Sequence, residues 1–326
     1  MTKPIGVLVM AYGTAAGPAD IERYYTDIRG GRVPTSEHLE ELKGRYAAIG
    51  NRFPLLETTR RQAEGLEREL NRGADEPRYR VYLGMKHSPP FIAEGVERMR
   101  ADGVERAVGL VLAPHWSAMS VETYVERVEK ALIEGGPEFT YVRRWYAYPW
   151  FVDFLASRVS EALERLSPAD REGAAVVFSA HSLPTRALPD GTARCKACDL
   201  CPDGCRYAAE LQETADLVAA RLGLENYLIA WQSVGRTSDP WWGPPVEEVI
   251  RDLAGAGHPA VVVCSAGFVA DHLETLYDLD VEARQVAEEA GIRFIRTKMP
   301  NDDPVFITGL ATVVREHAEP APADPS

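Results

Sequence analysis

Eight short apolar runs, rich in β-branched residues, recur along the 326-residue chain and alternate with segments of helical periodicity. The runs are IGVLVMAYG, YRVYLGM, RAVGLVLAP, TYVRRWY, AAVVFSAHS, YLIAWQS, PAVVVCSAGF and RFIRTKMP. The helical segments include LETTRRQAEGLERELNR and FVDFLASRVSEALERL. Nearly continuous apolar strands are buried on both faces, and parallel neighbours need a crossover helix between them. The alternation therefore predicts a doubly wound α/β fold with parallel sheets.

Three features of the first half of the chain recur in the second half in the same order. GVLVMAYGT resembles AVVFSAHSL, and RAVGLVLAPHWSAMSVETY resembles PAVVVCSAGFVADHLETLY with one gap. SPPFIAEGVERM and WWGPPVEEVIRDL each place a Pro-rich loop before a helix. We therefore predict two pseudo-symmetric Rossmann-like lobes, residues 1–150 and 151–316, each a parallel four-stranded sheet flanked by helices. Residues 317–326, rich in Pro and Ala, are expected to form a disordered tail.

Charge and hydropathy exclude several classes of protein. The net charge of −13 argues against nucleic acid or an anionic membrane surface as the main partner. No apolar run approaches the roughly 20 residues that a spanning helix needs, so stable membrane insertion is not expected. The opening MTKPIGVLVMAYGT lacks the basic region of a signal peptide and is typical of a first strand. These features predict a cytoplasmic protein.

The stretch VADHLETLYDLDVE, residues 269–282, places carboxylates at helical intervals directly after a strand. In an α-helix, Glu274, Asp278 and Glu282 would form a stripe about 80° wide on one face. Such a stripe is typical either of a solvated helix edge or of a carboxylate path that collects or conducts a cation.

Tyr12, His181 and the helix that carries Glu274 all follow strand ends, where ligands bind in doubly wound folds. His181, in SAHSLP, is consistent with a hydrogen-bonded structural histidine, and equally with a metal ligand or proton acceptor. The acidic stripe in the same lobe favours the second interpretation. His115, in APHWS, occupies a similar strand end and is interpreted as structural. We expect the three strand-end groups to face one cleft between the lobes.

The segment IERYYTDIRGGRVPTSEHLEELKGRYAAIGNRFPL is rich in Arg and Tyr and is long for a connection between a strand and a helix. The guanidinium groups of Arg29, Arg32 and Arg45 suit carboxylate or phosphate groups of a ligand, or glutamates of the same segment. The sequence contains no P-loop, no GxGxxG after a strand, no HExxH and no GxSxG. The common nucleotide-binding and hydrolase motifs therefore give no support to those functions.

Four of the five cysteines lie in RCKACDLCPDGC, within an insertion spanning residues 190–206; they are Cys195, Cys198, Cys201 and Cys205. Four thiols so close together in a cytosolic chain favour a metal centre over disulfides. The spacing allows a [2Fe–2S] or [4Fe–4S] cluster or zinc. An electron-transfer protein would use such a centre, but it would need neither this large scaffold nor the acidic helix. Cys264, in AVVVCSAGF, is interpreted as a buried core thiol.

A series of motifs in this chain resembles the ferrochelatases, in the same order and over residues 4 to 316. They are MAYGT, IERYYTDIRGGR, LKGRYAAIG, GMKHSPPF, LAPHWS, SAHSLP, WQSVGRTSDPWWGP and GFVADHLETLYD. The compact early loop, without a long hydrophobic lip, is similar to the coproporphyrin type found in many bacteria. The resemblance implies a lyase-class metal chelatase that inserts Fe²⁺ into coproporphyrin III, with release of two pyrrole protons, to give coproheme in haem biosynthesis.

The resemblance also implies a soluble monomer that makes transient contacts with other haem-pathway enzymes. The alternatives are a protoporphyrin IX ferrochelatase, a related tetrapyrrole chelatase for Co²⁺ or Ni²⁺, and a tetrapyrrole or metal carrier without turnover. Some ferrochelatases carry a [2Fe–2S] cluster, so the resemblance favours that cluster for the four cysteines.

By position, the resemblance assigns roles to single residues. His181 and Glu274 match the metal-handling pair, and Asp278 and Glu282 would deliver iron or remove protons. The positions that match porphyrin contacts are Tyr12, on the face opposite His181, and Arg29, Arg45, Tyr46 and Tyr124. The chain departs from the family at Phe53, where the coproporphyrin type often has a serine. A backbone N–H would have to replace the hydrogen bond from that serine to a propionate.

Overall fold

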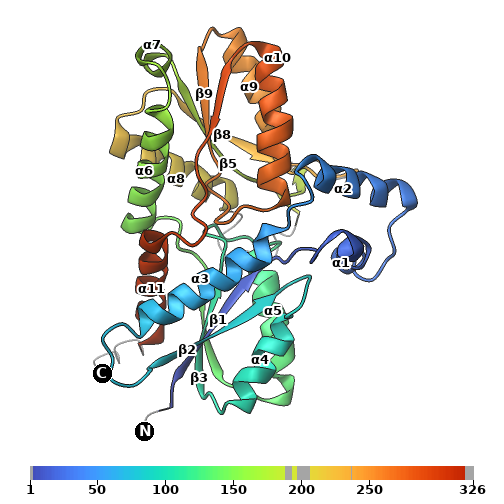
Figure 1. Cartoon of the computed structure of the whole chain (residues 1–326), viewed down its shortest axis with the longest axis vertical. Coiled ribbons are helices and arrows are strands. Elements are labelled where there is room, and N and C mark those ends of the chain that lie inside the picture. Colours follow the sequence, from blue (N-terminus) through green and yellow to red (C-terminus); the bar gives the residue numbers. More distant parts are fainter. Residues whose placement is uncertain (1–2, 188–192, 197–205, 236, 320–326) are drawn as a thin grey trace.

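The computed structural model describes residues 3–187, 193–196, 206–235 and 237–319, which form two α/β lobes (Figure 1). The sheet of the first lobe has the order β2-β1-β3-β4; its strands are β1 (Ile5–Ala11), β2 (Tyr79–Met85), β3 (Arg106–Val111) and β4 (Glu138–Val142). The sheet of the second lobe has the order β10-β9-β5-β8; its strands are β5 (Ala175–His181), β8 (Tyr227–Gln232), β9 (Ala260–Cys264) and β10 (Arg293–Arg296). All pairings within both sheets are parallel.

The two sheets share one topology. Along each sheet the strands follow the order second, first, third, fourth, when numbered within their own lobe. In both lobes an isolated parallel bridge joins the end of the second strand to the Pro-rich loop that follows it. Met85 pairs with Phe91 in the first lobe, and Trp231 pairs with Pro245 in the second. The predicted pair of pseudo-symmetric parallel sheets is therefore confirmed.

Helices flank both sheets. Those of the first half are α1 (Ile21–Ile28), α2 (Ser36–Ala48), α3 (Pro54–Leu70), α4 (Ile92–Ala101) and α5 (Val121–Ala131). Those of the second half are α6 (Pro149–Leu163), α7 (Pro168–Glu172), α8 (Tyr207–Leu222), α9 (Val246–Gly255), α10 (Arg284–Ala290) and α11 (Pro304–Ala318). A wider helix, Thr275–Ala283, precedes α10, and a short hairpin of β6 (Thr185–Ala187) and β7 (Ala193–Cys195) follows β5. None of the described helices is long and apolar enough to cross a membrane.

The last helix, α11, crosses back to the first lobe, where it lies against α3 (Figure 1). Arg315 donates to the carbonyl of Glu69 at 2.7 Å, and Arg106 donates to the carbonyl of Ala318 at 2.7 Å. A division of the chain near residue 150 therefore separates the two sheets. Helix α11 follows the second sheet in sequence but packs against the first lobe. The helix also continues two residues into the segment 317–326 that was expected to be disordered. Residues 320–326 of that segment lie outside the described residues.

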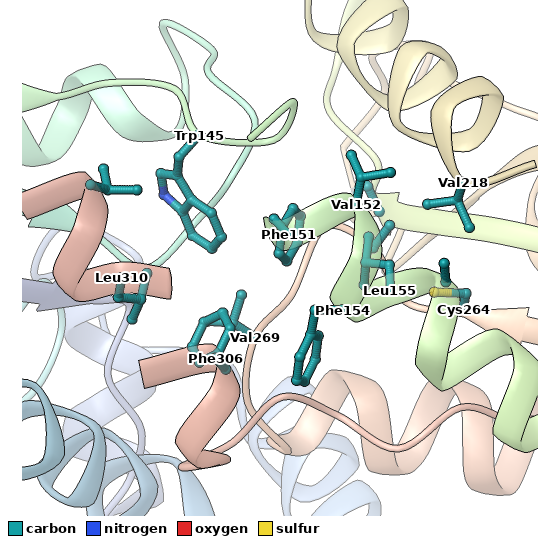
Figure 2. Packing of buried hydrophobic residues seen from close by; sticks show 14 of the residues in the cluster. Trp145, Phe151, Val152, Phe154, Leu155, Val218, Cys264, Val269, Phe306 and Leu310 are labelled. Atoms are coloured by element: carbon teal, nitrogen blue, oxygen red, sulfur yellow. The ribbon is translucent and has the colours of Figure 1, made fainter. Parts of the chain in front are cut away.

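An aromatic cluster joins the lobes where α6 and α11 meet (Figure 2). Trp145, Phe151 and Phe306 are at most 1% exposed. The rings of Trp145 and Phe151 meet edge to face, with centroids 4.8 Å apart, and Trp145 stacks on Trp150 at 5.9 Å. Close-packed aromatic rings bury much area and resist displacement. The two sheets therefore share one continuous core.

Gly309 of α11 provides a test of this packing. A Cβ at this position would lie 2.1 Å from the ring of Trp150, which is held by its stack on Trp145. We expect Gly309→Ala to lower the free energy of unfolding by about 1–3 kcal/mol, as overpacking usually does. Denaturant titration measures this change. The matched control is Gly44→Ala in α2, where a new Cβ meets nothing within 4 Å and gains helix propensity. An equal effect of both substitutions would contradict the packing argument.

Candidate active site

The site is built on the carboxyl ends of β1 and β5, the equivalent first strands of the two lobes. Tyr12 directly follows β1 and is 40% exposed, and His181 is the last residue of β5. Burial and then the nearby negative charge of Glu274 raise the pKa of Tyr12. Glu274 belongs to the second lobe and Tyr12 to the first, so its charge acts across the two lobes. The structure brings two of the predicted groups, His181 and Glu274, into direct contact distance.

Glu274 lies between two imidazoles. Its Oε1 is 3.7 Å from Nε2 of His181, and its Oε2 is 3.5 Å from Nε2 of His272. About a third of the side-chain surface of His181 and of Glu274 remains exposed, 34% and 33%. The other ring nitrogen of His181, Nδ1, hydrogen-bonds the carbonyl of Ser182. This bond aims Nε2 at the carboxylate, and metal-binding histidines are usually held in this way through their other ring nitrogen.

The charges in this group are strongly coupled. Burial alone would lower the pKa of His181, but Glu274 outweighs it and raises the pKa to about 9. Burial alone would raise the pKa of Glu274, but His181 and His272 outweigh it and hold the pKa well below its usual range. The pair therefore rests as imidazolium and carboxylate near pH 7. A metal ligand or proton acceptor has to be a neutral imidazole, so His181 can take either role only after this proton has left.

Most of the acidic stripe lies on a π-helix and not on the expected α-helix: Asp278 and Glu282 are within it, and Glu274 is its N-cap. Thr275–Ala283 is π-helical, and the N–H of Arg284 bonds the carbonyl of Leu279, five residues back. In an α-helix each step of four residues overshoots a full turn by about 40°. The five-residue hydrogen bonds of a π-helix reduce the rotation per residue, so side chains four apart lie more nearly in a straight row. Glu274, Asp278 and Glu282 are such a row.

Asp278 is buried in the middle of the row, with 5% of its side chain exposed. It accepts a hydrogen bond from the hydroxyl of Ser233 at 2.5 Å, and Arg45 lies 3.9 Å away. Burial, and then the charge of Glu274, raise the pKa of Asp278 to about 7. Asp278 can therefore take up or release a proton near neutral pH. Ser233 has a left-handed φ of 61°, which is uncommon outside glycine and places its hydroxyl at this carboxylate.

A second polar group surrounds Tyr12 in the first lobe, and the sequence analysis assigned no role to it. The rings of His87 and Tyr12 lie 4.6 Å apart, and Nδ1 of His87 is 2.7 Å from Asp27. Nζ of Lys86 lies 5.7 Å from the ring centre of Tyr12 and 5.2 Å from that of Tyr124. Burial, aided by Arg127, lowers the pKa of Lys86 to about 8. The motif GMKHSPPF contains both missed residues, Lys86 and His87.

The predicted porphyrin-contacting residues fall into two groups. Tyr46 and Tyr124 are almost fully buried, 1% and 5% exposed, and Tyr46 stacks on Phe53 at 4.4 Å. Arg29, at the end of α1, lies over the ring of Tyr25, and its buried Nε has no hydrogen-bond partner among the described residues. Arg45 lies over Tyr277 and 3.5 Å from Glu41, so it already has an acidic neighbour within its own segment.

The cysteine motif is described only in part. Cys195 is wholly buried at the end of β7. Cys198, Cys201 and Cys205 lie outside the described residues. Cys264 is buried in β9, as expected for a core thiol, and burial raises the pKa of its thiol to about 12. Among the described residues, no three His, Cys, Asp or Glu side chains converge closely enough to surround a metal ion on their own.

Comparison with known protein families agrees with this geometry. The family model described as Ferrochelatase matches residues 4–318 of the chain. The chain belongs to the ferrochelatase family. The chain is 46% identical to the coproporphyrin III ferrochelatase of Anoxybacillus flavithermus, over 97% of this chain and 96% of that protein. It is 42% identical to the coproporphyrin III ferrochelatase of Listeria monocytogenes, over 97% of this chain and 99% of that protein.

Solved structures of other chelatases share the fold of this ferrochelatase family member. The sirohydrochlorin chelatase SirB from Bacillus subtilis, solved with cobalt, matches with a TM-score of 0.57 over 97% of this chain and 95% of that chain. CbiX, the terminal enzyme of siroheme biosynthesis in denitrifying bacteria, matches with a TM-score of 0.54 over 97% and 100%. The sequence identities are 12% and 10%, so these matches concern the fold alone.

The stability contributed by the His181–Glu274 pair should depend on pH. The pKa of His181 rises from 6.5 to about 9 on folding, so the contribution is complete below pH 6.5 and is lost as the pH rises to about 9. Glu274, whose pKa is lowered, stays ionised throughout this window. We expect the urea midpoints of wild type and His181→Gln to differ more at about pH 6 than at about pH 9.5. A difference that is constant with pH would show that the pair is not ionised as described.

Proposed function

We propose that this chain is a ferrochelatase that inserts Fe²⁺ into coproporphyrin III to form coproheme. The observation that carries the proposal is the Glu274 carboxylate between His181 and His272 at the carboxyl end of the second sheet. The relatives named coproporphyrin III ferrochelatase, at 42–46% identity over nearly the whole chain, support the same substrate. The shared fold of cobalt- and iron-containing chelatase structures is consistent with metal insertion.

The reaction exchanges two pyrrole protons for one ferrous ion, and iron does not change oxidation state. The macrocycle has to bend so that the lone pairs of the pyrrole nitrogens point at the ion. His181 carries a proton in the metal-free site and has to lose it before it binds iron or accepts a pyrrole proton. The approach of Fe²⁺ to Glu274 favours that loss, because a second positive charge destabilises the imidazolium. The neutral imidazole then accepts a proton from the ring.

The carboxylate row provides a path for charge on the same side of the porphyrin. Glu282 and Asp278 would pass Fe²⁺ toward Glu274, because oxygen ligands at successive positions allow a cation to move without becoming fully desolvated. In the other direction, Asp278 would carry protons away, since its pKa of about 7 suits both uptake and release. Of these groups Glu274 is the one in contact distance of His181, so it would be the end of the path.

The acidic edge of the porphyrin requires cations on the first lobe. Arg29 is the stronger candidate for a propionate contact, because its Nε is buried and has no partner among the described residues. Arg45 shares its charge with Glu41 and Asp278, so it would have to exchange partners to bind a propionate. Tyr46 and Tyr124 would shape the wall behind the ring, because they expose almost no surface. Tyr12 would approach the ring from the face opposite His181.

We also propose a cytoplasmic location and a monomer that contacts other enzymes of haem biosynthesis transiently. A net charge of −13 favours a protein that stays dispersed in solution as a monomer.

Anaerobic insertion of Fe²⁺ tests the proposed activity. We expect coproporphyrin III to be metallated with a higher kcat/KM than protoporphyrin IX. His181→Ala should lower kcat at least a hundredfold, the usual effect of losing a general base, while porphyrin binding measured by fluorescence quenching persists. The control is His317→Ala on α11, a histidine whose Nδ1 bonds the carbonyl of Val313 within its own helix. Porphyrin binding without turnover would identify a carrier, and metallation with Co²⁺ or Ni²⁺ alone would identify another chelatase.

We further propose that the four cysteines of the insertion hold a [2Fe–2S] cluster. Cys195, Cys198, Cys201 and Cys205 supply the four thiolates that such a cluster needs, within one short segment. Cys195 is buried, which suits a sulfur that is shielded from solvent. Because the ligands are local, the cluster would stabilise the insertion, and possession of a cluster is not required for the non-redox insertion reaction. A [4Fe–4S] cluster or zinc would use the same donors.

Metal and sulfide analysis of anaerobically purified protein tests this assignment. We expect a red-brown protein with about two iron and two sulfide per chain. Cys198→Ser should lose the colour and lower the melting temperature. The control is Cys264→Ser in β9, which lies outside the cysteine motif and should keep the colour. A colourless protein that contains one zinc per chain would exclude the iron–sulfur assignment.

A further inference from the structure

The peptide that joins His181 to Ser182 is held at both of its polar edges. Its N–H, from Ser182, donates to the carbonyl of Gln232 at 2.8 Å. Its carbonyl, from His181, accepts a hydrogen bond from the hydroxyl of Tyr207 at 2.9 Å. The orientation of this peptide sets where the following carbonyl, of Ser182, lies. That carbonyl is the partner of Nδ1 of the His181 ring.

Tyr207 is a rigid donor. It is the first residue of α8 and is 6% exposed. Its ring packs against Trp231 with centroids 5.5 Å apart and meets the edge of His115 at 6.4 Å. A buried tyrosine has few torsions left, so its hydroxyl can fix an acceptor at little entropic cost.

The first turns of α8 are in turn attached to the first lobe. Glu210 is fully buried; its Oε2 accepts from the backbone N–H of Trp116 at 2.8 Å, and its Oε1 accepts from Arg144 at 2.5 Å. Thr214 hydrogen-bonds Nε2 of His115 at 2.9 Å. Trp116 and His115 follow β3 of the lobe that carries Tyr12. Helix α8 is therefore anchored to the first lobe through Glu210 and Thr214, and its first residue, Tyr207, hydrogen-bonds the backbone of His181.

We propose that Tyr207 is a positioning residue for metal insertion: its hydroxyl orients the 181–182 peptide and, through the Ser182 carbonyl, the imidazole of His181. The inference rests on the proposed function and deepens it. Partners of this kind typically change metal affinity or activity by 10–100-fold when they are lost. A purely structural role, in which the hydroxyl only satisfies a buried carbonyl, would change stability without changing the metal site.

The test compares Tyr207→Phe with Tyr146→Phe. Both substitutions keep the ring and remove a hydroxyl that hydrogen-bonds to or from α8; the hydroxyl of Tyr146 donates to Glu213 at 2.7 Å and also interacts with Arg206. Three quantities are measured on the full chain: the melting temperature, kcat and KM for coproporphyrin III and Fe²⁺, and the affinity for Co²⁺ alone by calorimetry. We expect Tyr207→Phe to weaken Co²⁺ binding and lower kcat about tenfold or more, with an unchanged KM for the porphyrin. Tyr146→Phe should change kcat and Co²⁺ affinity less than twofold, with a similar loss of stability.

Each outcome decides between the two roles. If Tyr207→Phe behaves like Tyr146→Phe in kcat and in Co²⁺ affinity, the positioning role is wrong. An equal loss of kcat in both variants that follows the loss of stability would also overturn it. If the wild type inserts no iron, the proposed function fails instead. The Co²⁺ titration then still decides whether Tyr207 orients the His181 site.

Discussion

The ionised carboxylate of Glu274 between two imidazoles is the interaction on which the candidate site depends. Removing a carboxylate from water is costly unless nearby positive charge compensates, and His181 and His272 provide that compensation. Burial raises the pKa of Asp278 and that of Tyr12, and the same carboxylate raises both further. One charge therefore contributes to the protonation of groups in both lobes, and an arriving cation would act on all of them together.

The duplicated fold explains how one charge reaches so many partners. Both sheets have the same strand order, so β1 and β5 deliver Tyr12 and His181 to equivalent edges. The aromatic core around Trp145, together with the return of α11 to the first lobe, joins the sheets so that these edges face each other. Buried polar contacts between α8 and the first lobe, such as that of Glu210 with Trp116, also hold the second lobe in place against the first. A rigid connection suits a reaction in which the metal and the proton acceptor have to meet the ring centre with little error.

Much of this architecture was predictable because it depends on local pattern. The apolar runs predicted all eight strands of the two sheets, and the internal likeness of the two halves predicted their common topology. Tyr12, His181 and Glu274 were predictable because parallel strands place their carboxyl ends at one edge. Lys86, His87 and His272 were not identified as site residues. Lys86 and His87 contact the ring of Tyr12, which is distant in sequence, and the contact of His272 with Glu274 depends on how the backbone turns between them.

The amino-acid sequence by itself determined the fold class, the internal duplication, the resemblance to ferrochelatases and the strand-end residues, since these follow from periodicity and short motifs. Only the tertiary structure decided the protonation of those residues and the shape of the acidic row. The spacing of Glu274, Asp278 and Glu282 fits an α-helix, yet packing produces a π-helix at these positions. Likewise, nothing in SAHSLP indicates that the imidazole of His181 is protonated near pH 7 or that Tyr207 holds its carbonyl. The physical reason is that pKa values and backbone orientation depend on burial and on partners brought together by folding, whereas strand and helix patterns depend on near neighbours in the chain.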